Sequence, residues 1–264
     1  MRSSRLRPSR EVSLKLLRIV GFYVAIVAVW SLLGRAEVWS PFLFPSPEKV
    51  FESLRTNFAN GLILDGLQAS LRRLAAGYAI SFVLGMSLGL LTAAWRFADE
   101  TIGGVVLGLQ SLPSITWLPL AVLWFGLSES AIIFVVLMGS TFSIAISARS
   151  GMRGLPPLLA RAAGTLGATR WQLYRYVVIP AMVPSMVQGM KQGWSFAWRS
   201  LMAGELLFVS VGLGHLLDVG RNLNNINMVF AIMLVIIAVG VAVDRLIFGR
   251  AEAWVHERWG FSAG

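Results

Sequence analysis

The chain has 264 residues, of which 56% are hydrophobic and 14% charged, with a formal net charge of +10 and no cysteine. So small a polar fraction excludes an ordinary soluble domain and predicts an integral membrane protein. The absence of cysteine excludes disulfides, thiolate nucleophiles and cysteine-based zinc sites. The basic residues are spread among hydrophobic stretches, so they favour membrane topology and the lipid surface over nucleic-acid binding.

Six hydrophobic stretches approach the roughly 20 residues that a helix needs to cross a bilayer core about 30 Å thick. They lie at 19–33, 74–94, 102–125, 131–148, 183–208 and 228–248. We therefore expect an all-α protein with about six transmembrane helices in one membrane domain over 19–248. The basic N-terminus, 1–18, and the C-terminal tail, 249–264, would lie outside the membrane.

The distribution of positive charge predicts how these spans are oriented. Fifteen Lys and Arg residues fall in the two termini and in the loops after the second and fourth spans, whereas six fall in the other loops. Because positive charge in short loops stays in the cytoplasm, we expect both termini and the loop after the fourth span to be cytoplasmic. A cleaved signal peptide is the competing interpretation of the first span, but the sequence after Leu33 is a poor cleavage site.

After the first span, residues 41–66 predict an amphipathic segment on the periplasmic side. Ser46 suits the cap of a helix, Pro47 its first position, and Glu48 its positive end. The apolar face of this helix would consist of Val50, Phe51, Leu54 and Phe58. Such a helix would lie on the membrane surface or against the bundle, or would serve as a plain connector.

Small residues and prolines predict how the second and third spans are built. In the second span, Gly85 and Gly89 form a small-x-x-x-small pair, and Gly77 extends the same stripe. This spacing favours close helix packing. In the third span, Pro113 and Pro119 interrupt the backbone hydrogen bonds and predict a bend.

The loop between the fourth and fifth spans, residues 155–180, is named the hinge. Thr169 is followed three residues later by Gln172, a capping-box pattern that predicts a helix starting just after Gly167. We therefore expect a short helix, a glycine bend and a second helix. Gly167 would permit a backbone conformation that a side chain hinders, and Pro180 would stop the second helix.

A stripe of mostly polar residues follows one face of the fifth span. It consists of Gln188, Gln192, Ser195, Arg199 and Met202, at spacings of four, three, four and three. A polar stripe in a membrane helix is expected to face protein or water. A guanidinium inside the bilayer costs roughly 2.5 to 3.5 kcal/mol on insertion scales, so Arg199 needs a partner. Two hypotheses remain open: Arg199 attracts an anionic solute in the path, or it pairs with Glu205 or another acid as a structural lock.

The sequence excludes several kinds of chemistry. It contains no phosphate loop of the form G-x-x-x-x-G-K-[ST], so we expect no ATP hydrolysis by this chain. Its two histidines, His215 and His256, do not have the spacing of a zinc pair or of a catalytic triad. We therefore expect no metal, no cofactor and no catalytic residues in this polypeptide.

Three stretches resemble the permease subunit of binding-protein-dependent ABC importers, in the branch that handles nitrate, sulfonates and taurine. They are LQSLPSITWLPLAVLWFGLSE at 109–129, the hinge, and GELLFVSVGLGHLLD at 204–218. The likeness extends over about 71–248. The family usually has glutamate before the two alanines of the hinge, where this chain has Arg161, so docking would rely on an altered partner or more on shape than on charge.

The resemblance implies a bacterial inner-membrane complex that works by alternating access. Two copies of this chain would form the path, two cytoplasmic ATPase subunits would bind ATP and Mg, and an extracytoplasmic protein would deliver the solute. The contacts with the ATPase would be made by Arg161, Ala162, Ala163, Gly167, Ala168, Arg170, Arg175 and Pro180. A self-contained secondary transporter is the alternative, with Glu205 as its coupling acid, but no inverted repeat supports it.

Overall fold

The computed structural model describes residues 8–36, 39–40, 42–207 and 210–259, and in this part of the chain all regular structure is helical. Positions 1–7, 37–38, 41, 208–209 and 260–264 of the predicted segments lie outside the described residues. The helices are α1 (Pro8–Arg35), α2 (Pro47–Ala59), α3 (Leu62–Ala94), α4 (Arg96–Ala98), α5 (Gly104–Gln110), α6 (Leu118–Phe125), α7 (Glu129–Arg153), α8 (Pro157–Thr165), α9 (Arg170–Leu173), α10 (Ile179–Leu207), α11 (Leu213–Asn222), α12 (Ile226–Val243) and α13 (Gly249–Trp259). Shorter 3-10 or π turns join some of them: η1 (Asp99–Gly103), η2 (Ser114–Trp117), η3 (Tyr174–Val178) and η4 (Asp244–Phe248). The all-α prediction is confirmed for the described residues.

Four helical stretches of the described chain are long and apolar enough to cross a membrane. They are Leu17–Arg35, Leu62–Ala94, Glu129–Arg153 and Ile226–Trp259. A fifth candidate is a pair of helical stretches bent by 100°, Arg96–Gln110 and Ser114–Phe125. α10 has 29 residues but is not among these candidates, because its glutamines, lysine and arginine lower its hydropathy. By length and composition, the structure therefore supports four or five spans.

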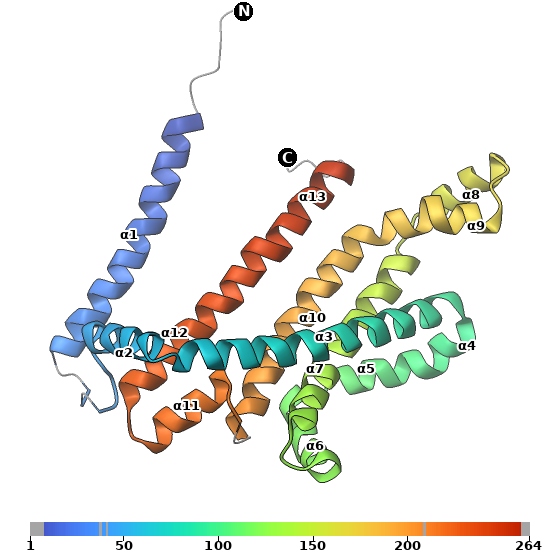
Figure 1. Cartoon of the computed structure of the whole chain (residues 1–264). Helices are drawn as coiled ribbons and strands as arrows, with labels where there is room; N and C mark the ends of the chain where they lie inside the picture. The colour runs from blue at the N-terminus through green and yellow to red at the C-terminus, as the bar shows by residue number, and fades with distance from the viewer. Residues whose placement is uncertain (1–7, 37–38, 41, 208–209, 260–264) are drawn as a thin grey trace, which may run out of the picture.

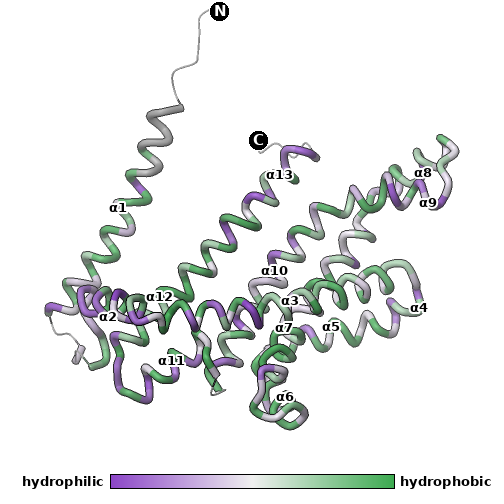
Figure 2. Tube along the Cα trace, in the orientation of Figure 1, coloured by the Kyte–Doolittle hydropathy of each residue, from purple (hydrophilic) through white to green (hydrophobic). Residues whose placement is uncertain are grey.

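The ends of the molecule differ in the elements they carry. The start of α1, the end of α13 and the pair α8–α9 lie toward the top of Figure 1, whereas α2, α6 and α11 lie toward the bottom. In Figure 2, apolar residues follow one another along α12, while polar residues are frequent in α2 and α13. The main core forms where α3, α7, α10, α11 and α12 meet, and it contains Leu74, Val135, Leu201, Leu213 and Ile232.

α3 is longer than the predicted second span. It begins at Leu62 rather than at Leu74, so the predicted outer segment 41–66 includes its first turn, and Arg72 and Arg73 lie inside the helix. The prediction placed both arginines in an outer loop because they end the apolar run. Arginine ends an apolar run without ending a helix, since it is among the better helix formers.

The predicted packing of the second span through its glycines is confirmed. A Cβ added to Gly85 would lie 2.6 Å from the carbonyl oxygen of Thr141, and one added to Gly77 would lie 2.8 Å from Cγ1 of Val136. Both neighbours belong to α7, and Gly89 is equally close to that helix at Ala145. The absence of side chains on α3 therefore lets the two backbones approach each other.

The bend predicted in the third span is present, but only one proline accounts for it. Pro113 has φ −56° and ψ 135°, an extended conformation that separates α5 from η2. Pro119 instead lies in the first turn of α6. A proline in a first helical turn removes a donor that has no intrahelical acceptor, so the prediction that Pro119 also breaks the span is wrong.

The outer helix α2 starts where predicted but packs with only part of its predicted apolar face. Val50 is buried and Leu54 packs against the core, whereas Phe51 and Phe58 are exposed. Ser46 occupies the cap position without a capping hydrogen bond from its side chain. The pKa of Glu48 is lowered, first by its own backbone N–H and then by the side chain of Ser46.

Candidate functional site

The hinge has the predicted order of helix, glycine bend and helix. α8 ends at Thr165, α9 begins at Arg170, and Gly167 lies between them with φ +77°, in the left-handed region that favours glycine. The capping box is complete: the N–H of Gln172 donates to Oγ1 of Thr169 at 3.3 Å, and the N–H of Thr169 donates to Oε1 of Gln172 at 2.8 Å. These local predictions are confirmed.

The hinge is fastened to the bundle through the end of α7. Nε of Arg149 and Nη1 of Arg153 each lie 2.5 Å from a carboxylate oxygen of Asp99 in η1. Nη2 of Arg153 also donates to the carbonyl oxygen of Thr92, at the end of α3. Arg149 and Arg153 therefore fix the helix from which the hinge extends.

The surface of the hinge combines cations with large apolar side chains. Arg161, Ala162, Gly167, Arg170 and Arg175 are exposed, Ala168 is half-buried and Ala163 is buried. No ion pair within the described residues involves the three arginines. The large exposed apolar side chains of the hinge are Leu158, Leu159, Leu166, Trp171, Tyr176 and Ile179. Exposed apolar side chains beside unpaired cations form a surface suited to an acidic, partly apolar partner.

Pro180 does not stop the second helix of the hinge, contrary to the prediction. α9 continues through the π turn η3 into α10, and Pro180 is the second residue of α10. A π turn changes the hydrogen-bond register of a helix, and a proline in the next turn then removes no required donor. The hinge is therefore joined without a break to the helix that carries the polar stripe.

The stripe on α10 is exposed along four of its five predicted positions. Gln188, Gln192, Ser195 and Arg199 are exposed, whereas Met202 is 9% exposed and belongs to the main core. Met202 lies roughly 60° from Arg199 around a helix of 3.6 residues per turn, which turns it toward the neighbouring helices. The stripe of the folded protein therefore consists of Gln188, Gln192, Ser195 and Arg199.

Arg199 has no acidic partner in the described part of the chain. Its Nε donates to the carbonyl oxygen of Ser195 at 3.0 Å, its Nη2 lies 3.4 Å from Oγ of the same serine, and its guanidinium lies 4.8 Å from the ring centroid of Phe196. The hypothesis that Arg199 pairs with Glu205 is wrong, because Glu205 is bound elsewhere. A guanidinium held only by its own helix can donate to a further acceptor.

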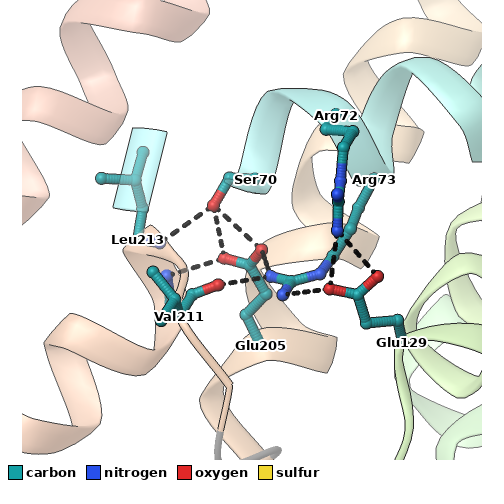
Figure 3. Close-up of polar contacts among 8 residues, drawn as sticks. Ser70, Arg72, Arg73, Glu129, Glu205, Val211 and Leu213 are labelled. Carbon is teal, nitrogen blue, oxygen red and sulfur yellow. Dashed lines mark hydrogen bonds and ion pairs between the residues drawn. The ribbon is translucent and has the colours of Figure 1, made fainter. Parts of the chain in front are cut away.

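Glu205 lies near the C-terminal end of α10, the end away from the hinge, in a buried polar cluster (Figure 3). Its side chain is 0% exposed, and that of its partner Arg73 is 3% exposed. Oε1 of Glu205 accepts from Nη1 of Arg73 at 2.9 Å, and both carboxylate oxygens lie within 2.9 Å of Oγ of Ser70. The N–H of Gly214 donates to Oε2 at 3.0 Å. The buried carboxylate is thus hydrogen-bonded on both oxygens.

The other end of Arg73 extends this cluster to two further elements. Its Nη1 donates to the carbonyl oxygen of Val211 at 2.6 Å, and its Nη2 donates to Glu129 at 2.9 Å. Glu129 is also bound by Arg72, at 3.0 Å. The prediction missed this cluster because it placed Arg73 in a loop. The available signal was Glu205 itself, since an acid within a span requires a partner.

The described residues contain no group of three or more His, Cys, Asp or Glu side chains that could hold a metal ion. The described residues do contain three candidate functional features. These are a hinge whose exposed arginines form no ion pair within that part of the chain, a polar stripe on α10, and a buried cluster around Glu205 at the C-terminal end of α10.

Residues 81–248 match the family model of the binding-protein-dependent transport system inner membrane component. The chain belongs to this family. It is 33% identical over 224 residues to an ABC transporter permease protein of Methanocaldococcus jannaschii, covering 83% of this chain and 84% of that one. It is 26% identical over 215 residues to the taurine transport system permease protein of Escherichia coli, covering 80% and 77%. The resemblance inferred from the three sequence stretches is confirmed, and the chain is a multi-pass permease of the inner membrane.

The fold of this permease is similar to a chain of the MetNI methionine ABC transporter in an inward-facing conformation. The TM-score is 0.64 at 20% identity, over 74% of this chain and 96% of that one. At this identity the similarity concerns the fold alone.

Proposed function

We propose that this permease crosses the membrane six times with both termini and the hinge in the cytoplasm. Five of the spans would be the four apolar stretches and the bent pair Arg96–Gln110 and Ser114–Phe125. α10 would be the sixth, because its stripe of Gln188, Gln192, Ser195 and Arg199 lies on one exposed face while its other face packs against the core. A helix that lines an aqueous path needs fewer apolar residues than one surrounded by lipid.

Cysteine labelling tests this topology directly, because the natural chain contains no cysteine. Leu166 in the hinge is 87% exposed and Leu223, just after α11, is 69% exposed. With a membrane-impermeant maleimide, we expect Leu223→Cys to react in spheroplasts and Leu166→Cys to react only in inside-out vesicles. Labelling of Leu166→Cys from outside would contradict the proposed orientation.

The stripe supports the proposal that α10 lines the solute path. Four polar side chains lie exposed on a helix of the membrane domain, and within the described chain the guanidinium of Arg199 contacts only Ser195 and Phe196 of its own helix. A planar guanidinium matches the oxygens of a sulfonate, carboxylate or nitrate group. We infer a small anionic solute, and the taurine permease among the relatives makes a sulfonate the first compound to test.

Substitution of Arg199 tests both proposals: that α10 lines the solute path and that the solute is an anion. A charge-assisted hydrogen bond contributes about 1.5 to 3 kcal/mol, so Arg199→Gln is expected to lower uptake of taurine or ethanesulfonate about tenfold or more, with Arg199→Lys in between. Arg221→Gln serves as the control, because Arg221 is an exposed arginine on α11 that pairs with Asp218. Uptake in proteoliposomes is the measurement, and full uptake with unchanged solute preference in Arg199→Gln would exclude a role in the path.

The family and the exposed surface of the hinge support the following proposal for the partners of this permease. We propose a homodimer of this chain in lipid, with two cytoplasmic ATPase subunits docked on the hinge and an extracytoplasmic binding protein on the opposite face. ATP and Mg would be bound by the ATPase, and this chain would contribute no catalytic group. Copurification of a nucleotide-binding subunit with the intact hinge is expected, and transport by the purified permease alone would favour a secondary transporter instead.

A further inference from the structure

Four helices meet in the buried cluster around Glu205. Glu205 lies near the end of α10 and binds Ser70 and Arg73 of α3 and the N–H of Gly214 in α11. Through Arg73, the same cluster includes Glu129, the first residue of α7. No other acidic residue of the described chain is completely buried. The cluster therefore joins α3, α7, α10 and α11 at one point.

The contact between α10 and α11 is close at the level of the backbone. A Cβ added to Gly214 would lie 2.6 Å from Cβ of Glu205 and 2.8 Å from the carbonyl oxygen of Met202. In addition, the N–H of Leu213 donates to Oγ of Ser70 at 2.9 Å. α11 therefore cannot slide along α10 or away from α3 without breaking hydrogen bonds to buried groups.

Opening this cluster would remove partners from charged groups in a buried place. A buried ion pair is strongly destabilised when one partner is removed, because the other remains desolvated and unpaired. Here Arg73, Glu205, Ser70 and two backbone N–H groups would lose partners together. Such a cluster is suited to hold a fixed arrangement rather than to open in every transport cycle.

We propose that Glu205 is a positioning residue that fixes α11 to the end of α10, so that the stripe, α11 and the adjoining part of α3 move as one body when the hinge moves. The proposal rests on the proposed coupling of the hinge to an ATPase. Because α9, η3 and α10 are continuous, displacement of the hinge would reach α11 through α10 and its bond to Glu205. The competing arrangement is a gate in which α3 separates from α11, and Arg73 from Glu205, during each cycle.

A disulfide between α3 and α11 distinguishes these arrangements. A Cβ on Gly66 would lie 3.0 Å from Cδ1 of Leu216, so positions 66 and 216 are in side-chain contact, and Gly66→Cys with Leu216→Cys is the pair to cross-link in a chain without other cysteines. The measurement is ATP hydrolysis, stimulated by the binding protein, of the complex in proteoliposomes before and after oxidation. We expect the disulfide to leave the stimulated rate unchanged. Inhibition that dithiothreitol reverses would show that α11 must separate from α3, and would overturn the proposal.

The variant Glu205→Gln provides the second part of the test. We expect it to lower the stimulated rate about tenfold, within the range of measured coupling between sites. Oxidation of the cysteine pair in the same background is expected to leave the rate low, because the disulfide joins α3 to α11 and does not replace the attachment of α10 through Glu205. Arg72→Gln is the control, since Arg72 binds Glu129 without touching Glu205. Full stimulation of Glu205→Gln, or a rate that oxidation restores, would contradict the proposal.

Assembly is followed separately by the amount of ATPase that copurifies. If Glu205→Gln does not assemble, Ser70→Ala repeats the series, because Oγ of Ser70 contacts both carboxylate oxygens and accepts from Leu213. If the unaltered complex shows no stimulated hydrolysis at all, the proposed coupling function fails, whereas failure of the Glu205 proposal leaves that stimulation intact.

Discussion

Gly167→Val is expected to abolish the coupling of ATP hydrolysis to uptake while leaving the permease inserted in the membrane. Gly167 has φ +77°, and a left-handed conformation costs an ordinary residue roughly 1 to 2 kcal/mol, more for a β-branched one. No atom lies within 4 Å of an added Cβ. The effect would therefore come from the backbone of the hinge and not from a clash within this chain.

The prediction has a matched pair of controls. Gly167→Asn is expected to retain coupling, since asparagine adopts left-handed conformations more readily than other residues with side chains. Gly164→Ala lies in α8 with equally open surroundings and an ordinary helical backbone, so it is expected to behave like the natural protein. The measurements are ATP hydrolysis and solute uptake by the same proteoliposomes. Uptake by Gly167→Val at the natural rate would contradict the role assigned to the hinge.

The parts of this structure that the sequence predicts are those that depend on nearby residues. The capping box at Thr169 needs only Gln172, three positions away, and the glycine bend needs only Gly167. The bend in the third span needs only Pro113. Hydropathy likewise identified the apolar helices, because each satisfies its own backbone hydrogen bonds inside the membrane.

The parts that the sequence does not predict depend on residues far apart. Arg73 and Glu205 are 132 positions apart, and neither has a neighbour in sequence that indicates the other. Hydropathy also placed the start of α3 at Leu74, because it measures transfer to lipid and not helix formation. Met202 shares the spacing of the stripe but lies in the core, since spacing alone does not give the width of an exposed face.

Gly85→Ala is expected to be strongly destabilising, and no side-chain truncation on α7 should rescue it. The added Cβ would lie 2.6 Å from the carbonyl oxygen of Thr141, which belongs to the backbone and is held by the helix. Overpacking typically costs about 1 to 3 kcal/mol, and the upper end of this range is expected because α7 must move as a whole. Gly108→Ala in α5 is the control, since nothing lies within 4 Å of its added Cβ.

Gly77→Ala gives the contrasting case on the same pair of helices. Its added Cβ would lie 2.8 Å from Cγ1 of Val136, an atom that Val136→Ala removes. The double variant is therefore expected to recover part of the stability lost by Gly77→Ala, whereas Thr141→Ala should recover none of that lost by Gly85→Ala, because alanine keeps the obstructing carbonyl. Thermal unfolding in detergent, followed by size-exclusion chromatography, measures all five variants. If Thr141→Ala rescued Gly85→Ala as well as Val136→Ala rescues Gly77→Ala, the backbone contact between α3 and α7 would not be what limits their approach.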